Sequence, residues 1–171
     1  MVNSKLKDSF FLLSGIFGSC ILFFGLIQTS PQLYYVIGST LLLFTALHFR
    51  IIYFIALELI IIAGHAATFL HIGTAMQIAM PSLLTLQLFA FYLLSGQLNN
   101  IFLLIGIAGI AFHSVGFAYE NQWIFFFGSL SIAIYAFYAY YKGKKVALLW
   151  AILNSLFTLT AVYKLIFLIK I

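Results

Sequence analysis

The residues best suited to chemistry in this sequence are ionisable groups that interrupt long apolar segments. Glu58 lies inside the stretch IALELIIIAGH, and His65 ends the same stretch seven positions later. On an α-helix, seven positions return a side chain to within about 20° of the same face, about 10 Å further along the axis. An ionisable side chain in a bilayer is costly unless it faces a partner or water. The pair therefore predicts one polar cavity inside a membrane protein.

A second group of polar residues could line the same cavity. In the stretch LLWAILNS, Trp150 and Asn154 are four residues apart and so lie stacked on one helix face. An aromatic ring beside an amide can hold a flat polar solute, the ring by stacking and the amide by hydrogen bonds. Gln77 and Gln87 could extend this site. The residues expected to bind substrate are Glu58, Trp150, Asn154, Phe54, His65 and His113.

Structural roles compete with binding for each of these residues. Trp150 could belong to an aromatic belt at the membrane surface, and Asn154 could bridge two helices. His65 and His113 could equally be satisfied residues of a helix bundle. A purely structural role is weakest for Glu58, because a buried acid is a costly way to join helices.

The composition predicts an all-α polytopic membrane protein with seven transmembrane helices. The chain has 171 residues, of which 65% are hydrophobic and 6% are charged, compared with about a quarter charged in a soluble domain. A helix needs about 20 apolar residues to cross a bilayer core. Seven segments fit, namely 9–28, 32–49, 51–71, 75–95, 100–118, 122–141 and 146–169. Only a tight turn around His48 and Arg50 can separate the second segment from the third.

The charges indicate how the helices are oriented. The net charge of +5 comes without a soluble domain on which basic residues could cluster, so nucleic acid is not an expected partner. The side that holds the N-terminus receives most basic residues: Lys5, Lys7, Arg50, Lys142, Lys144 and Lys145. By the positive-inside rule, we expect a multi-pass protein of the cell (inner) membrane, with the N-terminus cytoplasmic and the C-terminus outside. Lys164, near the outer end of the last helix, is expected to snorkel to the membrane surface.

Nothing in the sequence divides the chain into parts, so residues 1–171 are expected to form one transmembrane domain. Residues 1–8 form a short polar lead without a following cleavage signal, so we expect the first helix to be retained. Cys20 is the only cysteine, which rules out an intrachain disulfide and a multi-cysteine metal site. The sequence indicates no cofactor and no metal, and it neither requires nor excludes a homo-oligomer.

One phrase occurs twice in the sequence. FLLSGIFG at residues 11–18 and FLLIGIAG at residues 102–109 agree at six of eight positions. After a one-residue gap the match continues through Gln32, Gly38, Ser39 and Ala46, which meet Gln122, Gly128, Ser129 and Ala136. Extending the alignment across the Lys142 loop sets Phe54 against Trp150 and Glu58 against Asn154.

Because the shift is four helices, both copies would run in the same direction, which predicts a parallel 3+1+3 architecture. Its halves are residues 9–73 and 99–170, and residues 74–96 form the joining helix. The alternative is chance similarity among hydrophobic helices that contain glycine.

Seven helices in this order resemble the SWEET sugar facilitators and the related PnuC vitamin transporters, which are PQ-loop type proteins. The stretch SLSIAIYAFYAYYKGKKVALLWAILNSLF, residues 129–157, resembles a PnuC segment in which a short basic loop precedes LLW, with an Asn four residues after the Trp. Pro31 with Gln32 is similar to the Pro-Gln pair of PQ-loop proteins. The resemblance implies that Trp150 and Asn154 line a vitamin site.

The leading hypothesis is a membrane transporter, passive or proton-linked, that carries a small polar or aromatic solute such as a vitamin or sugar by alternating access. Glu58 would bind a substrate donor or carry a coupling proton. The alternative is an intramembrane enzyme acting on a lipid or lipid-like substrate, with Glu58, His65 and His113 as acid–base or metal groups. The sequence has no HExxH or Gly-x-Ser-x-Gly motif, so the enzyme ranks second. A non-catalytic membrane subunit is a third interpretation.

Overall fold

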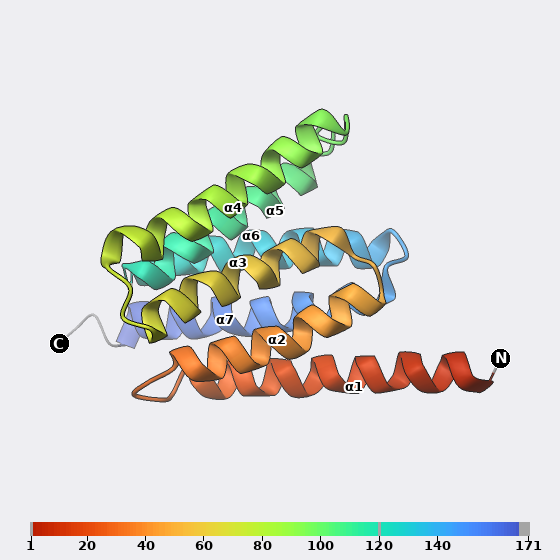
Figure 1. Ribbon diagram of the computed structural model, residues 1–171, viewed down its shortest axis with the longest axis horizontal. Helices are drawn as coiled ribbons and strands as arrows, with labels where there is room; N and C mark the ends of the chain where they lie inside the picture. The colour runs from red at the N-terminus through yellow and green to blue at the C-terminus, as the bar shows by residue number, and fades with distance from the viewer. Residues whose placement is uncertain (1, 120, 168–171) are drawn as a thin grey trace.

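The computed structural model describes residues 2–119 and 121–167, which form seven α-helices joined by short turns (Figure 1). A helix satisfies most of its own backbone hydrogen bonds, as a bilayer requires. The helices are α1 (Val2–Gly25), α2 (Gln32–His48), α3 (Ile52–Phe69), α4 (Thr74–Leu94), α5 (Ile101–Ala118), α6 (Gln122–Tyr141) and α7 (Leu148–Phe167). A short 3₁₀-helix, Lys145–Ala147, leads directly into α7.

Among the residues that the structure describes, five segments are helical, long and apolar enough to cross a membrane: Lys5–Gly25, Ile52–Phe69, Ala75–Leu94, Gln122–Tyr141 and Lys145–Phe167. Gln32–His48 and Ile101–Gly116 are shorter apolar helices. These findings confirm the predicted class, a helical membrane protein. Most helix bounds lie close to the predicted segments, but α1 begins at Val2 and so includes the polar lead.

The turn between α2 and α3 is as tight as the sequence requires. Arg50 adopts a left-handed backbone conformation with φ of 54°, which is uncommon for a residue with a side chain. The amide of Ile51 then donates to the carbonyl oxygen of Ala46. This ending satisfies a helix carbonyl and reverses the chain at once, so α2 and α3 are separate helices.

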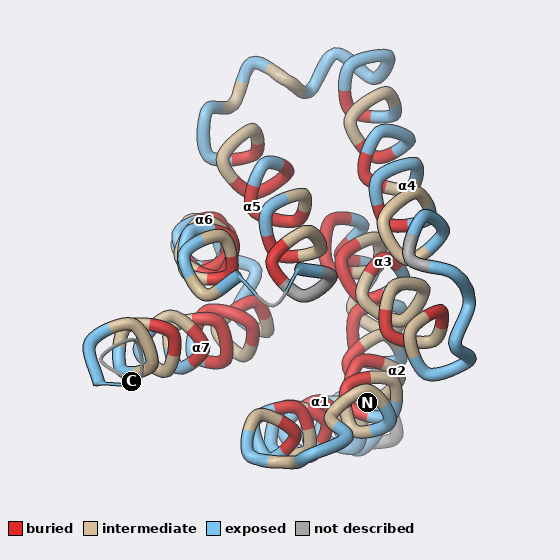
Figure 2. The backbone as a smooth tube through the Cα atoms, turned by 90° about the vertical axis from the view of Figure 1, so that its left-hand side faces the viewer, coloured by how far each residue is buried: buried red, intermediate tan, exposed pale blue. Residues whose placement is uncertain are grey.

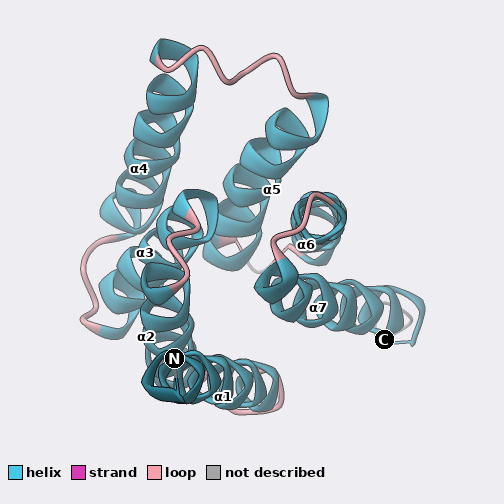
Figure 3. Cartoon of the chain, turned by 90° about the vertical axis from the view of Figure 1, so that its right-hand side faces the viewer, coloured by secondary structure: helices cyan, strands magenta, loops and turns pink. Residues whose placement is uncertain are grey.

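Six helices follow one another around a ring, which a contact between α1 and α7 completes. Helix α4 lies outside this ring (Figures 2 and 3). The order around the ring is α1, α2, α3, α5, α6 and α7, with α7 returning to α1, while α4 packs on α3 and α5. Large apolar side chains such as Phe17, Leu83 and Phe137 are exposed. Such a surface suits contact with lipid, where apolar side chains replace a polar exterior.

The contacts around the ring have a two-fold regularity. If α1 is exchanged with α5, α2 with α6 and α3 with α7, each pair of neighbouring helices in the ring becomes another pair that is also in contact. The contact of α1 with α7, for example, becomes the contact of α5 with α3.

Aligned glycines make matching close approaches in the two sets of helices. A Cβ atom on Gly18 of α1 would lie 2.7 Å from the carbonyl oxygen of Gly38 on α2. A Cβ atom on Gly109 of α5 would lie 3.1 Å from the carbonyl oxygen of Gly128 on α6. Backbones can approach this closely in lipid only where side chains are absent or very small.

Candidate functional site

A hydrogen bond joins α3 to α7 inside the ring. The indole Nε1 of Trp150 donates to Oε1 of Glu58 across 2.7 Å. Only 1% of Glu58 is exposed, and Trp150 is fully buried. The rings of Trp150 and Phe54 stack with their centroids 4.4 Å apart and their planes at 17°. Phe54 and Trp150, which the sequence alignment sets against each other, are therefore in direct contact.

The carboxyl group of Glu58 also has a polar neighbour on α2. The hydroxyl of Ser39 lies near enough to interact with the carboxyl group. Neither Ser39 Oγ nor Glu58 Oε2, however, makes a hydrogen bond of good geometry with any residue that the structure describes. Glu58 also has no ion pair among these residues. Its second oxygen can therefore accept a hydrogen bond from a solute or take up a proton.

A small buried chamber lies beside Glu58. Its volume is about 10 Å³, which is space for roughly one water molecule. Carboxyl, imidazole and amide side chains from three helices line it, namely Glu58 and His65 of α3, His113 of α5 and Asn154 of α7. The rest of its wall consists of Leu22, Tyr35, Leu57, Ile61, Leu153 and Phe157. We call this space the Glu58 chamber.

Neighbouring groups orient two of the chamber's polar side chains. The Nδ1 atom of His113 lies 3.3 Å from the hydroxyl oxygen of Ser129 on α6, which is completely buried. The amide nitrogen of Asn154 donates to the backbone carbonyl of Trp150 across 3.0 Å. These contacts limit the rotation of the imidazole and of the amide at the chamber wall.

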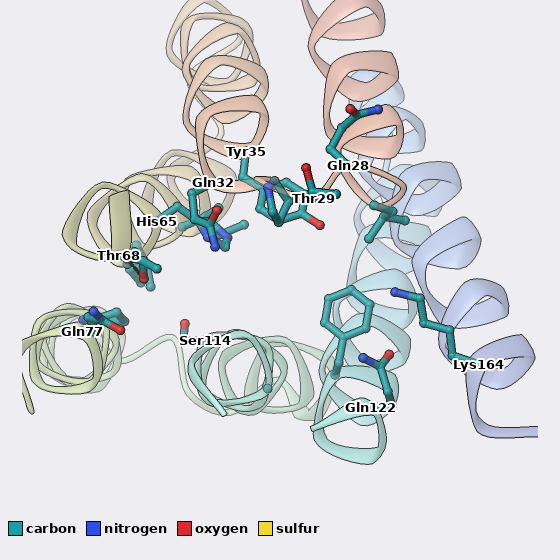
Figure 4. A pocket seen from close by; sticks show the side chains of 18 residues that line it. Gln28, Thr29, Gln32, Tyr35, His65, Thr68, Gln77, Ser114, Gln122 and Lys164 are labelled. Carbon is teal, nitrogen blue, oxygen red and sulfur yellow. Dashed lines mark hydrogen bonds between the residues drawn. The ribbon is translucent and has the colours of Figure 1, made fainter. Parts of the chain in front are cut away.

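A larger cavity, which we call the vestibule, opens at the end of the ring where α1 turns into α2. It has a volume of about 460 Å³, within the range of small-molecule sites in proteins. Side chains from α2 to α7 and from the α1–α2 turn line it. The polar residues of this lining are Gln28, Thr29, Gln32, Tyr35, His65, Thr68, Gln77, Ser114, Gln122 and Lys164 (Figure 4).

Tyr35 and His65 lie between the vestibule and the Glu58 chamber. Both residues, together with Ile61, line both cavities. The two rings are in contact, with centroids 4.6 Å apart. A solute in the vestibule is therefore separated from Glu58 by one layer of side chains.

An aromatic layer, which we call the plug, closes the other side of the chamber. It consists of Tyr53, Phe54, Tyr135 and Trp150, none of which is more than 6% exposed. Phe54 lies one helical turn before Glu58, whereas His65 lies after it, so the plug and the vestibule are on opposite sides of Glu58. The ring centroids of Tyr53 and Tyr135 are 4.0 Å apart. The Tyr53 hydroxyl donates a hydrogen bond to the carbonyl oxygen of Gly106 across 2.8 Å.

The structure thus places the predicted site residues in two layers. Glu58, His65, His113 and Asn154 line the chamber. Phe54 and Trp150 lie in the plug and line neither cavity. Of the two glutamines on α4, Gln77 lines the vestibule, whereas Gln87 is exposed on the outside of the helix.

Sequence reasoning missed most of the vestibule. Lys164 was expected to reach the membrane surface, but in the structure it is half-buried and lines the vestibule. Gln32 and Gln122 also line it, one at the start of α2 and one at the start of α6. The signal in the sequence for this pair was that the predicted repeat aligns Gln32 with Gln122.

The ring of apolar helices and its buried polar cavities define the class of this molecule, an integral membrane protein that encloses a polar site. No protein-family model, no curated protein and no solved structure matches the chain.

Proposed function

We propose that this protein transports a small polar or aromatic solute across the membrane by alternating access. The observation that carries the proposal is a polar vestibule that reaches, through one layer of side chains, the Glu58 chamber and then the plug. Alternating access requires a state in which the site opens toward the vestibule while the plug stays closed, and here only one layer, which includes Tyr35 and His65, separates the two cavities. The second state would open the plug and close the vestibule.

We further propose that all seven helices span the membrane as a parallel 3+1+3 repeat. Helices α1–α3 and α5–α7 would be the halves, and α4 would join them. The regular contacts of the ring and the matching glycine approaches support this arrangement. It is also the arrangement of the SWEET and PnuC transporters, which the sequence resembles. With a cytoplasmic N-terminus, the vestibule faces the outside.

Glu58 and Trp150 would couple the movement of the two halves to the state of the site. Their hydrogen bond crosses from α3 to α7, so rocking one half against the other would change it. An ionised carboxyl without a cation beside it is costly inside a bilayer, whereas a protonated one is tolerated. Glu58 is therefore the residue that we assign to proton coupling, with its second oxygen facing an incoming donor.

An intramembrane enzyme fits the same geometry less well. Glu58, His65 and His113 do line one chamber, but the vestibule that leads to it has many polar side chains in its lining, which suit a polar solute better than a lipid chain. Within residues 2–119 and 121–167, no group of three or more His, Cys, Asp or Glu side chains is placed to hold a metal ion. Transport is therefore the function that we propose.

Uptake into liposomes tests this proposal. Purified protein reconstituted into liposomes would be offered radiolabelled vitamins, sugars and organic acids, and we expect uptake of at least one of them. Glu58→Ala should abolish that uptake, whereas Gln87→Ala, on the exposed side of α4, should not change it. If no solute in the panel is taken up and none raises the unfolding temperature, the transport function is wrong.

A further inference from the structure

The vestibule contains a positive charge that the proposed mechanism does not use. Lys164 lies in the last turn of α7, and its side chain reaches from that helix into the cavity (Figure 4). A lysine that snorkels would instead extend toward lipid headgroups. Lys164 also has no ion pair with another residue of the described chain. Its ammonium group points into the space that a solute would occupy (Figure 4).

The described residues that line the vestibule include no acidic side chain, and Glu120, the third acidic residue of the sequence, lies outside the described residues. Glu58 lies in the chamber beyond Tyr35 and His65. Asp8 is on α1, where it pairs with His48 at 2.7 Å and lines neither cavity. A charge in a cleft with low-dielectric walls acts more strongly than the same charge in water. The Lys164 ammonium group would therefore act strongly on a charged group that enters the vestibule.

Neutral hydrogen-bond donors accompany the ammonium group. Gln122 and Lys164 both extend toward the cavity, from the neighbouring helices α6 and α7 (Figure 4). Gln28 and Gln32 contribute further amide groups to the same lining. An ammonium group beside amide N–H donors is suited to a carboxylate or a phosphate, because each can accept several hydrogen bonds.

We propose that the vestibule binds an anionic solute and that Lys164 pairs with the carboxylate or phosphate group of that solute. The cavity volume of about 460 Å³ suits a small organic acid or phosphate ester. The inference rests on the proposed function only where it identifies the bound anion as the transported solute. Binding itself can be tested without transport.

Thiol-reactive reagents of opposite charge test the potential in the vestibule directly. Thr68→Cys, in a Cys20→Ala background, places a thiol in the vestibule wall, and Ser114→Cys provides a second position on α5. The reagents are sulfonatoethyl and trimethylammonioethyl methanethiosulfonate, each normalised to its rate with mercaptoethanol. We expect the anionic reagent to react about tenfold faster. Lys164→Gln should remove this preference, and Lys164→Arg should keep it.

Preference for the cationic reagent, or an unchanged ratio in Lys164→Gln, would overturn the proposal. Failure of both reagents to react at both positions would also overturn it, because the vestibule would then not be open. Failure of the transport function would appear differently, as a vestibule that prefers anions in a protein without uptake.

Protection of Thr68→Cys from N-ethylmaleimide then identifies the anionic group. Benzoate and phenyl phosphate carry the two candidate groups on the same ring, and benzamide is their neutral control. We expect at least one anion to slow the reaction more than benzamide does, and the stronger one identifies the preferred group. Equal protection by all three compounds, stronger protection by benzamide, or no protection at all would contradict anion binding by Lys164.

Discussion

Trp150 on α7 donates a hydrogen bond of 2.7 Å to Glu58 on α3, and Phe54, one turn before Glu58, stacks on the same indole ring. The two residues belong to helices on different sides of the ring, and both are buried. Beside this bond lies the Glu58 chamber, with the plug on one side and the vestibule on the other. A change at this contact can therefore affect the stability of the ring and access to the site together.

Removing the indole donor should destabilise the protein. Trp150→Phe keeps an aromatic ring to stack on Phe54 but leaves Glu58 Oε1 buried without its donor, which costs about 1–3 kcal/mol. We expect a lower unfolding temperature in detergent, measured by circular dichroism. Trp123→Phe is the matched control, because Trp123 is 58% exposed. Equal unfolding temperatures for the wild type and Trp150→Phe would show that the bond does not stabilise the ring.

Glu58→Gln should separate the structural role of Glu58 from its role in proton coupling. A glutamine still offers an oxygen to Trp150 Nε1, so the protein should remain folded. It cannot take up or release a proton, so uptake should lose its dependence on external pH. Asp8→Asn, at the hydrogen bond with His48, should keep that dependence. A Glu58→Gln variant whose uptake still responds to pH would exclude Glu58 as the coupling group.

Close helix packing predicts a strong effect for a very small substitution. The added methyl group of Gly18→Ala would lie 2.7 Å from the backbone oxygen of Gly38, so the backbone of α1 or α2 would have to shift. Overpacking of this kind costs about 1–3 kcal/mol, and thermal unfolding in detergent should detect it. Gly73→Ala is the control, because a Cβ atom there would have nothing within 4 Å. If both variants unfold at the same temperature, the α1–α2 contact is looser than described.

The helices could be predicted from the sequence because the lengths of the apolar segments and the positions of the few charged residues show where each helix begins and ends. His48 and Arg50 marked the α2–α3 turn, and the structure has it there. The grouping of Glu58 with His65 followed from helix geometry, and both line the chamber. Only the alignment of the predicted repeat paired Phe54 with Trp150, because the two residues are far apart in the chain.

Other features of the site depend on packing that the sequence does not encode locally. Trp150 was expected to stack on a solute, but its indole N–H bonds to Glu58 and its ring is covered by Phe54. Lys164 has a long flexible side chain that could reach either the lipid headgroups or the cavity. The rotation of α7 about its own axis determines which of the two it reaches. The positions of such side chains follow from neighbouring helices, and single-sequence patterns carry no information about those.

The orientation of the helices in the membrane can be tested with two exposed positions. Gly73, before α4, should lie outside, and Lys144, before α7, should lie in the cytoplasm. In a Cys20→Ala background, an impermeant maleimide added to intact cells should label Gly73→Cys and leave Lys144→Cys unlabelled until the cells are opened. Labelling in the reverse pattern would invert the proposed topology, and labelling of both positions in intact cells would contradict seven spans.

Access to the Glu58 chamber from the two sides of the membrane tests alternating access most directly. Leu57→Cys places a thiol in the chamber wall, and Leu59→Cys places one on the same helix at a position that is 46% exposed on the outer surface. Both variants, in the Cys20→Ala background, would be treated with an impermeant methanethiosulfonate from either side of oriented membrane vesicles. We predict that Leu57→Cys reacts from both sides and Leu59→Cys from neither, because lipid covers it. Reaction of Leu57→Cys from one side only, or from neither, would contradict a chamber that opens alternately to the two sides.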